Sequence, residues 1–183
     1  MKQLELFSTQ KPNYSRQPYQ LEMSADALCQ WKQRIFDYQQ SASSSQPQQQ
    51  TLFELAPNPC DALDPFSLQL HNLSFCDKPD WGDRTCLYFV IDAAKPTPLL
   101  LYVGETHRTP KQRWVNHYCY GYVGSYIELH RRYSLDVAVG IAFWYGAPAN
   151  RKQRLQLESD LIYKWKSPFN KECWQWWGQP FGK

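Results

Sequence analysis

Residues 99–118, LLLYVGETHRTPKQRWVNHY, constrain the fold more than any other stretch of the chain. Residues 99–103 are an apolar run containing one Tyr, which predicts a buried strand. Gly104 then permits a sharp turn, and residues 109–112, TPKQ, form a capping-box pattern with proline at the first helical position. The stretch therefore predicts a strand, a tight turn and a helix that begins at Pro110.

Three polar side chains are expected to meet at this corner. On the predicted helix Arg113 and His117 are four residues apart, so they share a face. That face lies close to the end of the strand that carries Tyr102. Polar groups at such a corner are held firmly and remain reachable, although an ordinary turn with a solvated arginine is the alternative interpretation of this stretch taken alone.

Two further apolar runs complete the predicted sheet. Residues 86–92, CLYFVID, precede the loop AAKPTP and then the strand at residues 99–103. Two short strands joined by about six loop residues predict an antiparallel hairpin, in which Tyr88 and Tyr102 lie on neighbouring strands. Residues 135–145 are nearly all apolar and predict a third, central strand with both faces covered.

The predicted helices flank these strands. After a Gly/Tyr-rich turn at residues 120–124, we expect a helix at residues 125–133 and a longer one from about residue 149 to 164. The fold class is therefore α+β, with a small, mainly antiparallel three-stranded sheet flanked by helices over residues 81–183.

Residues 1–80 are predicted to be a partly disordered N-terminal extension. They contain one helix at residues 24–38, capped by Ser24, and a Gln/Ser-rich linker at residues 39–50, QQSASSSQPQQQ. The polar first 20 residues show no usable periodicity. We assign no chemistry to this extension, although it could recruit a protein partner.

Composition narrows the class of protein. The chain has no run of eighteen apolar residues and no apolar leader at its start, so we expect no membrane contact and a cytoplasmic location. Six scattered cysteines with no CxxC pair indicate neither a zinc site nor a disulfide framework. Residues 81–183 carry fourteen Lys/Arg against eight Asp/Glu, whereas residues 1–80 carry six against nine. The basic half favours a polyanionic partner such as DNA.

One carboxylate falls in an apolar stripe of the last long helix. Glu158 lies three residues after Leu155 and four before Ile162, which points it toward the core side. An ionised glutamate there is costly unless it is paired, protonated or bound to a metal. Pairing with Arg154 or Arg151 on the same helix is the structural alternative.

Taken in order, these residues resemble the signature of the GIY-YIG nuclease superfamily. Residues 86–88, CLY, correspond to the first signature strand, with Cys86 where the signature has Gly, and residues 102–104, YVG, to the second. The residues that carry the resemblance are Tyr88, Tyr102, Gly104, Arg113, His117, Glu158 and Asn170. The resemblance covers residues 85–170, about half the chain.

The resemblance implies a metal-dependent endonuclease that hydrolyses phosphodiester bonds in DNA by Tyr-assisted water attack at a single Mg²⁺ or Mn²⁺ site. Glu158 would bind the metal, Arg113 the phosphate oxygens, and Tyr88 would act as general base or relay. Tyr102 would position the water or phosphate, and His117 would assist proton transfer. Substrate-binding roles are expected for Gly104, Asn170, Arg108 and Lys111.

Two alternatives remain open from the sequence. In the first, the chain keeps a GIY-YIG-like fold without catalysis and binds nucleic acid. In the second, its aromatic-rich surface serves interaction with another protein. Strong salt dependence of DNA binding separates them, because only phosphate contacts release counterions. The sequence does not distinguish DNA from RNA as the substrate.

Overall fold

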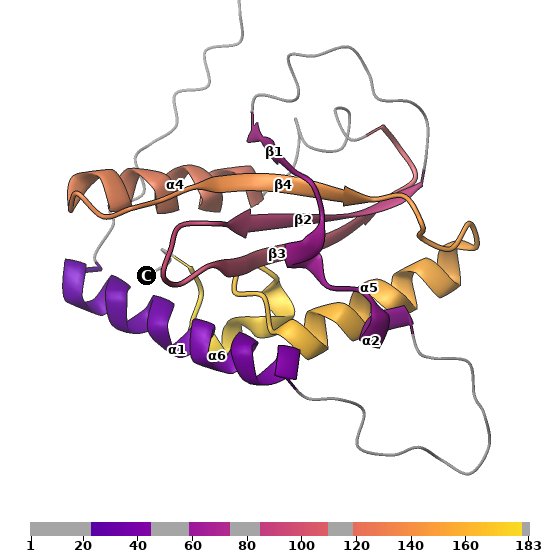
Figure 1. Ribbon diagram of the computed structural model, residues 1–183, viewed down its shortest axis with the longest axis horizontal. Coiled ribbons are helices and arrows are strands. Elements are labelled where there is room, and N and C mark those ends of the chain that lie inside the picture. Colours follow the sequence, from indigo (N-terminus) through magenta and orange to yellow (C-terminus); the bar gives the residue numbers. More distant parts are fainter. Residues whose placement is uncertain (1–22, 45–58, 74–84, 110–118, 181–183) are drawn as a thin grey trace, which may run out of the picture.

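The computed structural model describes residues 23–44, 59–73, 85–109 and 119–180. The described part of the chain is an α+β structure built on a four-stranded antiparallel sheet in the order β1-β4-β2-β3 (Figure 1). The strands are β1 (Leu70–Asn72), β2 (Cys86–Asp92), β3 (Leu99–Thr106) and β4 (Val139–Trp144). The α-helices are α1 (Ala25–Ser44), α2 (Pro59–Ala62), α4 (Cys119–Arg132), α5 (Arg151–Trp165) and α6 (Trp174–Trp177), with 3-10 turns η1 (Pro65–Ser67) and η3 (Lys171–Cys173).

The predicted hairpin and central strand are confirmed, but their ends differ. Strand β3 continues through Gly104, where a sharp turn is expected, to Thr106, and β4 begins at Val139 rather than at residue 135. Strands β2 and β3 pair antiparallel, with Tyr88 opposite Gly104 and Val90 opposite Tyr102. This register places both tyrosines on the same face of the sheet, because side chains two residues apart along a strand share a face. Strand β4 lies between β1 and β2, which is the central position that its apolar sequence predicts.

The expectation of three strands is wrong by one, because the segment assigned to the N-terminal extension adds β1 to the sheet. Leu70 pairs with Ala142 and Asn72 with Gly140 on β4. Strand β1 has only three residues, and they are exposed or half-exposed. Such a short edge strand has no hydrophobic alternation to reveal it, so its pairing with β4 decides its structure.

Helix α1 is longer than predicted. Its cap is confirmed, since the Ser24 hydroxyl accepts a hydrogen bond from the Ala27 N–H at 3.2 Å. The helix continues through Ser44, so residues 39–44 are helical rather than linker. Gln39 is 2% exposed, and its side chain pairs with the N–H and C=O of Leu100, both at 2.9 Å. Tertiary contacts therefore extend the helix into a low-complexity sequence.

Helix α4 also begins earlier than predicted, at Cys119, so the expected turn at residues 120–124 is helical. Cys119, Val123 and Tyr126 are buried at helical spacing along it. Packing of this face outweighs the helix propensity penalty of about 1 kcal/mol for each glycine in the segment. The helix predicted to begin at Pro110 falls outside the described residues.

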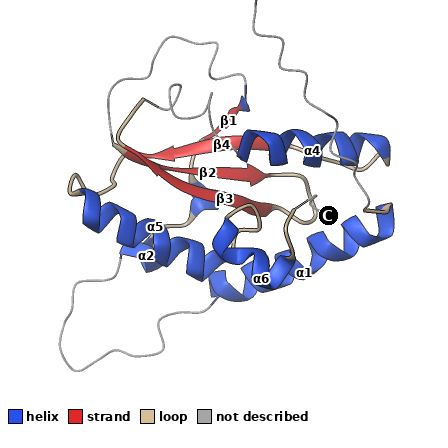
Figure 2. Cartoon of the chain, turned by 180° about the vertical axis from the view of Figure 1, so that it is seen from behind, coloured by secondary structure: helices blue, strands red, loops and turns tan. Residues whose placement is uncertain are grey.

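Helices cover both faces of the sheet. Alternate residues of β2, beginning with Cys86, pack with α1 and α4 on one face, and the intervening residues, beginning with Leu87, pack with α5 and α2 on the other. Both α1 and α5 meet β3, the strand at the edge of the sheet (Figures 1 and 2). No helix in the described ranges combines the length and apolar character needed to cross a membrane.

A buried polar network ties α1 and α4 to the end of β2. The Lys32 ammonium lies 3.0 Å from Asp92 Oδ2 and 3.1 Å from His130 Nε2. The Tyr126 hydroxyl donates to the same Asp92 oxygen at 2.6 Å. Lys32 is 8% exposed and the other three residues are fully buried. The network therefore places an ion pair inside the protein, where only complete hydrogen bonding makes it tolerable.

Hydrogen bonds and an ion pair keep Asp92 ionised although it is buried. Burial alone raises the pKa of this carboxyl, but hydrogen bonds from the Tyr126 hydroxyl and the Ala138 N–H, together with Lys32 and the Ala94 N–H, outweigh it. The net effect lowers the pKa of Asp92 below its usual 3.8. The folded protein therefore keeps this carboxylate charged at neutral pH.

His130 is held in its neutral form. Its Nδ1 lies 2.8 Å from the Tyr126 carbonyl oxygen, so this nitrogen carries the hydrogen, and Nε2 accepts from Lys32. Burial and the neighbouring ammonium lower the pKa of His130 below its usual 6.5, although the carbonyl partner opposes the shift. A proton on Nε2 would face the Lys32 ammonium directly.

We predict that the folded protein loses stability as the pH falls from 7 to 5. The unfolded chain takes up a proton at His130 near its usual pKa of 6.5, whereas the folded chain resists it, so acid favours unfolding. The lowered pKa of Asp92 adds a stabilisation that is lost only below its usual 3.8, outside this window. Urea unfolding at several pH values measures the change. In His130→Gln the unfolding free energy should depend less steeply on pH than in the wild type, and an unchanged pH dependence would contradict the neutral state assigned to His130.

Candidate functional site

Two predicted site residues, Tyr88 and Tyr102, meet over Gly104. A Cβ atom on Gly104 would lie 2.3 Å from Tyr88 Cζ and 2.8 Å from Tyr102 Cε1. The two ring centroids are 5.9 Å apart with the planes tilted by 30°. Tyr88 is 2% exposed and Tyr102 is 4% exposed. The position therefore admits only glycine, because the Tyr88 ring occupies the space that any larger residue needs.

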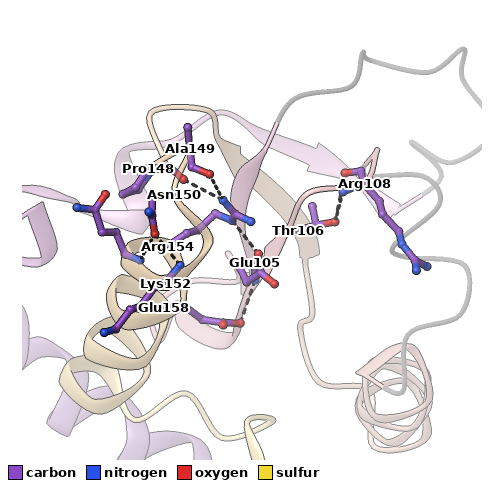
Figure 3. A network of polar contacts seen from close by, with 10 residues as sticks. Glu105, Thr106, Arg108, Pro148, Ala149, Asn150, Lys152, Arg154 and Glu158 are labelled. Carbon is purple, nitrogen blue, oxygen red and sulfur yellow. Dashed lines mark hydrogen bonds and ion pairs between the residues drawn. The ribbon is translucent and has the colours of Figure 1, made fainter.

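Glu158 reaches the same end of β3 from the middle of α5. Its Oε1 accepts a hydrogen bond from the Glu105 backbone N–H at 2.9 Å (Figure 3). Glu158 comes from α5, however, which covers the sheet face opposite the one where Tyr88 and Tyr102 pack. The structure thus brings together Tyr88, Tyr102 and Gly104, with Glu158 at the next backbone position of β3. Convergence of the carboxylate with the two rings stays a prediction.

The apolar stripe predicted around Glu158 is placed differently on α5. Leu155, expected inside it, is 38% exposed, and Glu158 is half-buried. The side chains that α5 buries are Arg154, Leu157, Leu161, Ile162 and Trp165. Glu158 therefore lies at the border of the core, where a carboxylate is less costly than inside it.

Arg154, which the sequence offered as a partner for Glu158, pairs with Glu105 instead. Its Nε lies 2.8 Å from Glu105 Oε2, and the guanidinium also donates to the carbonyls of Pro148 and Ala149 at 2.9 and 3.1 Å (Figure 3). Arg154 is 1% exposed, so these contacts compensate a buried charge. They fix the first turn of α5 to the end of β3. The Glu105 N–H, which donates a hydrogen bond to Glu158, is thereby held in place.

Asn170 supports the same strand. Its Oδ1 accepts from the Val103 N–H and its Nδ2 donates to the Val103 C=O, both at 2.9 Å. The Ser167 hydroxyl donates to the same Oδ1 at 2.6 Å, and Asn170 is 2% exposed. Asn170 therefore positions the β3 backbone at Val103, two residues before Glu105. Direct contact of Asn170 with substrate stays a prediction.

The remaining predicted residues are placed apart or lie outside the described ranges. Arg108 is exposed just beyond β3, its backbone N–H donates to Thr106 Oγ1 at 2.9 Å, and its side chain points away from Glu105 and Glu158 in Figure 3. Lys111, Arg113 and His117 fall within residues 110–118, outside the described residues. Their convergence with Tyr102 stays a prediction.

Glu158 is the carboxylate that the resemblance assigns to a metal. Within the described ranges, no three His, Cys, Asp or Glu side chains form a group that could hold an ion. The neighbouring Glu105 carboxylate pairs with Arg154. Mg²⁺ is often bound through one or two carboxylates with water completing the shell. A metal at Glu158 would therefore rely on this one carboxylate, and its binding stays a prediction.

Comparisons of the chain with protein-family models, curated proteins and solved structures find no match. The geometry at the end of β3 is therefore what bears on function. Sequence reasoning missed Glu105, and it offered Arg154 only as a partner for Glu158 rather than for Glu105. Their positions carry a weak signal: Glu105 directly follows Gly104, and Arg154 precedes Glu158 by one helical turn.

We predict that Gly104→Ala destabilises the protein by about 1–3 kcal/mol, because the new methyl group displaces the buried Tyr88 ring. Gly121→Ala is the matched control on α4, where a Cβ meets nothing within 4 Å. That variant should gain about 0.5–1 kcal/mol from helix propensity. Denaturant unfolding measures both changes, and equal stability of the two variants would contradict the packing described for Gly104.

We also predict that Asn170→Ala lowers stability by about 2 kcal/mol or more, since it leaves the buried N–H and C=O of Val103 without their partner. Gln175→Ala, at an exposed position, should change stability little. An Asn170→Ala protein that unfolds like the wild type but binds DNA more weakly would assign Asn170 to substrate contact instead.

Proposed function

We propose that the chain is a metal-dependent endonuclease of the GIY-YIG type that acts on DNA. The observation that carries this proposal is the Glu158 carboxylate, held at the N–H of Glu105, the residue directly after Gly104, over which Tyr88 and Tyr102 pack. A glutamate on a helix and two tyrosines on paired strands, reaching neighbouring backbone positions of β3, are the parts that the resemblance assigns to phosphodiester hydrolysis.

Glu158 supplies the ligand for the metal. Its carboxylate is fixed at one oxygen by the Glu105 N–H, and α5 is itself fixed to β3 by Arg154. A bound Mg²⁺ or Mn²⁺ would neutralise the negative charge that develops on the phosphate during hydrolysis. A ligand held on a rigid helix suits this role, because small displacements of a site residue cost rate.

The tyrosines handle the proton in this proposal. As water attacks phosphorus and the bond to the leaving oxygen breaks, Tyr88 would either take the proton of the attacking water as the phenolate or, as the phenol, relay it by giving its own hydroxyl proton to the leaving oxygen. Tyr102, diagonal to it across the hairpin, positions the water or the phosphate. Arg113 binds the phosphate oxygens through its planar guanidinium, and His117 assists proton transfer.

Exposed cations lie on the elements that carry the candidate site. Arg151 and Lys152 occupy the exposed start of α5, and Arg108 is exposed just beyond β3. Basic side chains on these elements suit contacts with the phosphates of a duplex. They support DNA as the substrate of the proposed enzyme.

A catalytically inactive nucleic-acid-binding module is the second candidate. The observation in its favour is the near-complete burial of Tyr88 and Tyr102, which gives both rings a packing role whatever their chemistry. The same basic residues would then bind DNA without cleaving it. Cleavage assays separate the two candidates.

The test is cleavage of plain, nicked and branched DNA in Mg²⁺, Mn²⁺ or EDTA by the wild type and Glu158→Gln. Glutamine keeps an oxygen that accepts from the Glu105 N–H but removes the charge that binds the metal. We expect metal-dependent cleavage by the wild type and a loss on the order of 100-fold or more in the variant.

Glu128→Gln is the matched control, because Glu128 is an exposed carboxylate on α4 beside Arg132. It should cleave like the wild type. Full activity of a folded Glu158→Gln protein would refute the metal assignment. Binding of DNA without cleavage of any substrate would favour the inactive module.

A further inference from the structure

A second surface, distinct from the β3 site, gathers aromatic rings around one ammonium group. Lys166, directly after α5, places its Nζ 4.1 Å from the ring centroid of Trp176, 4.3 Å from that of Tyr163 and 5.2 Å from that of Tyr38. The rings come from α6, α5 and α1, respectively. We name these four residues the Lys166 surface.

The Lys166 surface exposes unusually large aromatic side chains. Tyr163 is 70% exposed, the highest value among the exposed large hydrophobic residues of the described ranges, and Trp176 is 37% exposed. Tryptophan and tyrosine usually bury most of their surface inside proteins. Two such rings beside a lysine therefore form a flat, accessible contact area at the end of α5.

The backbone beneath these rings is fixed. Lys166 adopts a left-handed conformation with φ 45°, and its carbonyl accepts from the Trp177 indole N–H. The Trp31 indole donates to the Trp177 carbonyl at 3.1 Å, and Arg34 reaches the Trp176 carbonyl at 3.5 Å. Helix α6 is thereby held beside α1 (Figure 2). The rings are presented by a preorganised scaffold, which lowers the entropy lost on binding.

Cations and rings alternate across the neighbouring residues. The Arg34 guanidinium lies 5.8 Å from the Trp177 ring, and the Lys171 ammonium lies 5.9 Å from the Trp174 ring. Segments 34–38, 163–166 and 171–177 carry four Lys/Arg against two Asp/Glu. Lys164 pairs with Asp61 at 3.8 Å, whereas the Lys166 ammonium lies among the rings. Cationic and aromatic side chains are therefore interspersed on this surface.

We propose that the Lys166 surface binds single-stranded nucleic acid, with bases stacked on Tyr163 and Trp176 and phosphates beside the Lys166 ammonium. A single strand offers alternating bases and phosphates, which match alternating rings and cations. A duplex keeps its bases stacked inside. A protein partner is disfavoured because lysine is depleted at the centres of protein interfaces, whereas here it lies between the rings.

The surface lies apart from the proposed active site. Tyr163 follows Glu158 by five residues on α5, which turns its side chain about 140° around the helix axis from that of Glu158. Binding at the Lys166 surface does not require cleavage, so it goes beyond the proposed nuclease function.

The test is fluorescence anisotropy of a labelled dT20 oligonucleotide and of a 20-base-pair duplex with the full chain, in EDTA so that cleavage plays no part. We expect Tyr163→Ala and Trp176→Ala each to weaken dT20 binding by about fivefold or more and to change duplex binding little. Tyr145→Ala is the control, since Tyr145 is also exposed, at 38%, but follows β4. It should bind dT20 like the wild type.

A second variant tests the charge. Lys166→Gln should reduce the slope of log affinity against log salt by about 0.7, the value for one phosphate contact on a single strand. Wild-type binding of dT20 by the folded Tyr163→Ala protein would overturn the proposal, as would equal losses for dT20 and duplex. No binding of dT20 by the wild type would also overturn it and would favour a protein-facing role for the surface.

Discussion

The outer edge of β3 has to be paired, because β3 ends the sheet while most of its residues are buried. Buried backbone groups without partners are costly, and an open edge invites association with other chains. Here side chains and one backbone group from α1, α5 and the turn after α5 pair that edge. The contacts are Gln39 with Leu100, the Phe169 N–H with the Leu101 carbonyl at 2.9 Å, Asn170 with Val103 and Glu158 with Glu105.

This arrangement explains why the candidate metal ligand is where it is. Glu158 is the last member of the row of edge partners, at the point where β3 leaves the core. Its carboxylate accepts a hydrogen bond from a backbone N–H and lies at the core border. The Arg154–Glu105 pair holds the two elements together there, so strand edge, helix and ligand form one unit. In this account, Asn170 supports catalysis by holding the strand that Glu158 contacts.

The parts of the fold that the sequence predicts are those set by local patterns. The apolar runs of β2, β3 and β4, the Ser24 cap and the hairpin that sets Tyr88 and Tyr102 on neighbouring strands all follow from hydrophobicity and spacing. The register that puts both tyrosines on one face comes from the structure. Glu158 stood out because a carboxylate in an apolar pattern requires an explanation. Its partner was not predictable from that pattern, since Glu105 lies 53 residues earlier.

The parts that the sequence does not predict depend on distant contacts. Strand β1 has three residues and is stabilised by its pairing with β4. Gln39 lies in a Gln/Ser tract, and its contacts with β3 stabilise the helix there. Lys32 and Asp92 are 60 residues apart in the chain, and neither sits in a recognisable motif. Polar residues of this kind are ordinary surface residues by composition, and only the assembled fold reveals that they are buried.

Crystals of the protein soaked in Mn²⁺, with anomalous scattering measured at the manganese edge, show whether Glu158 binds a metal. We expect a manganese peak within ligand distance of the Glu158 carboxylate, about 2.0–2.3 Å, and no peak there in Glu158→Gln crystals. A wild-type crystal with Mn²⁺ bound elsewhere and none at Glu158 would contradict the metal assignment. The carboxylate at the end of β3 would then serve the strand edge alone.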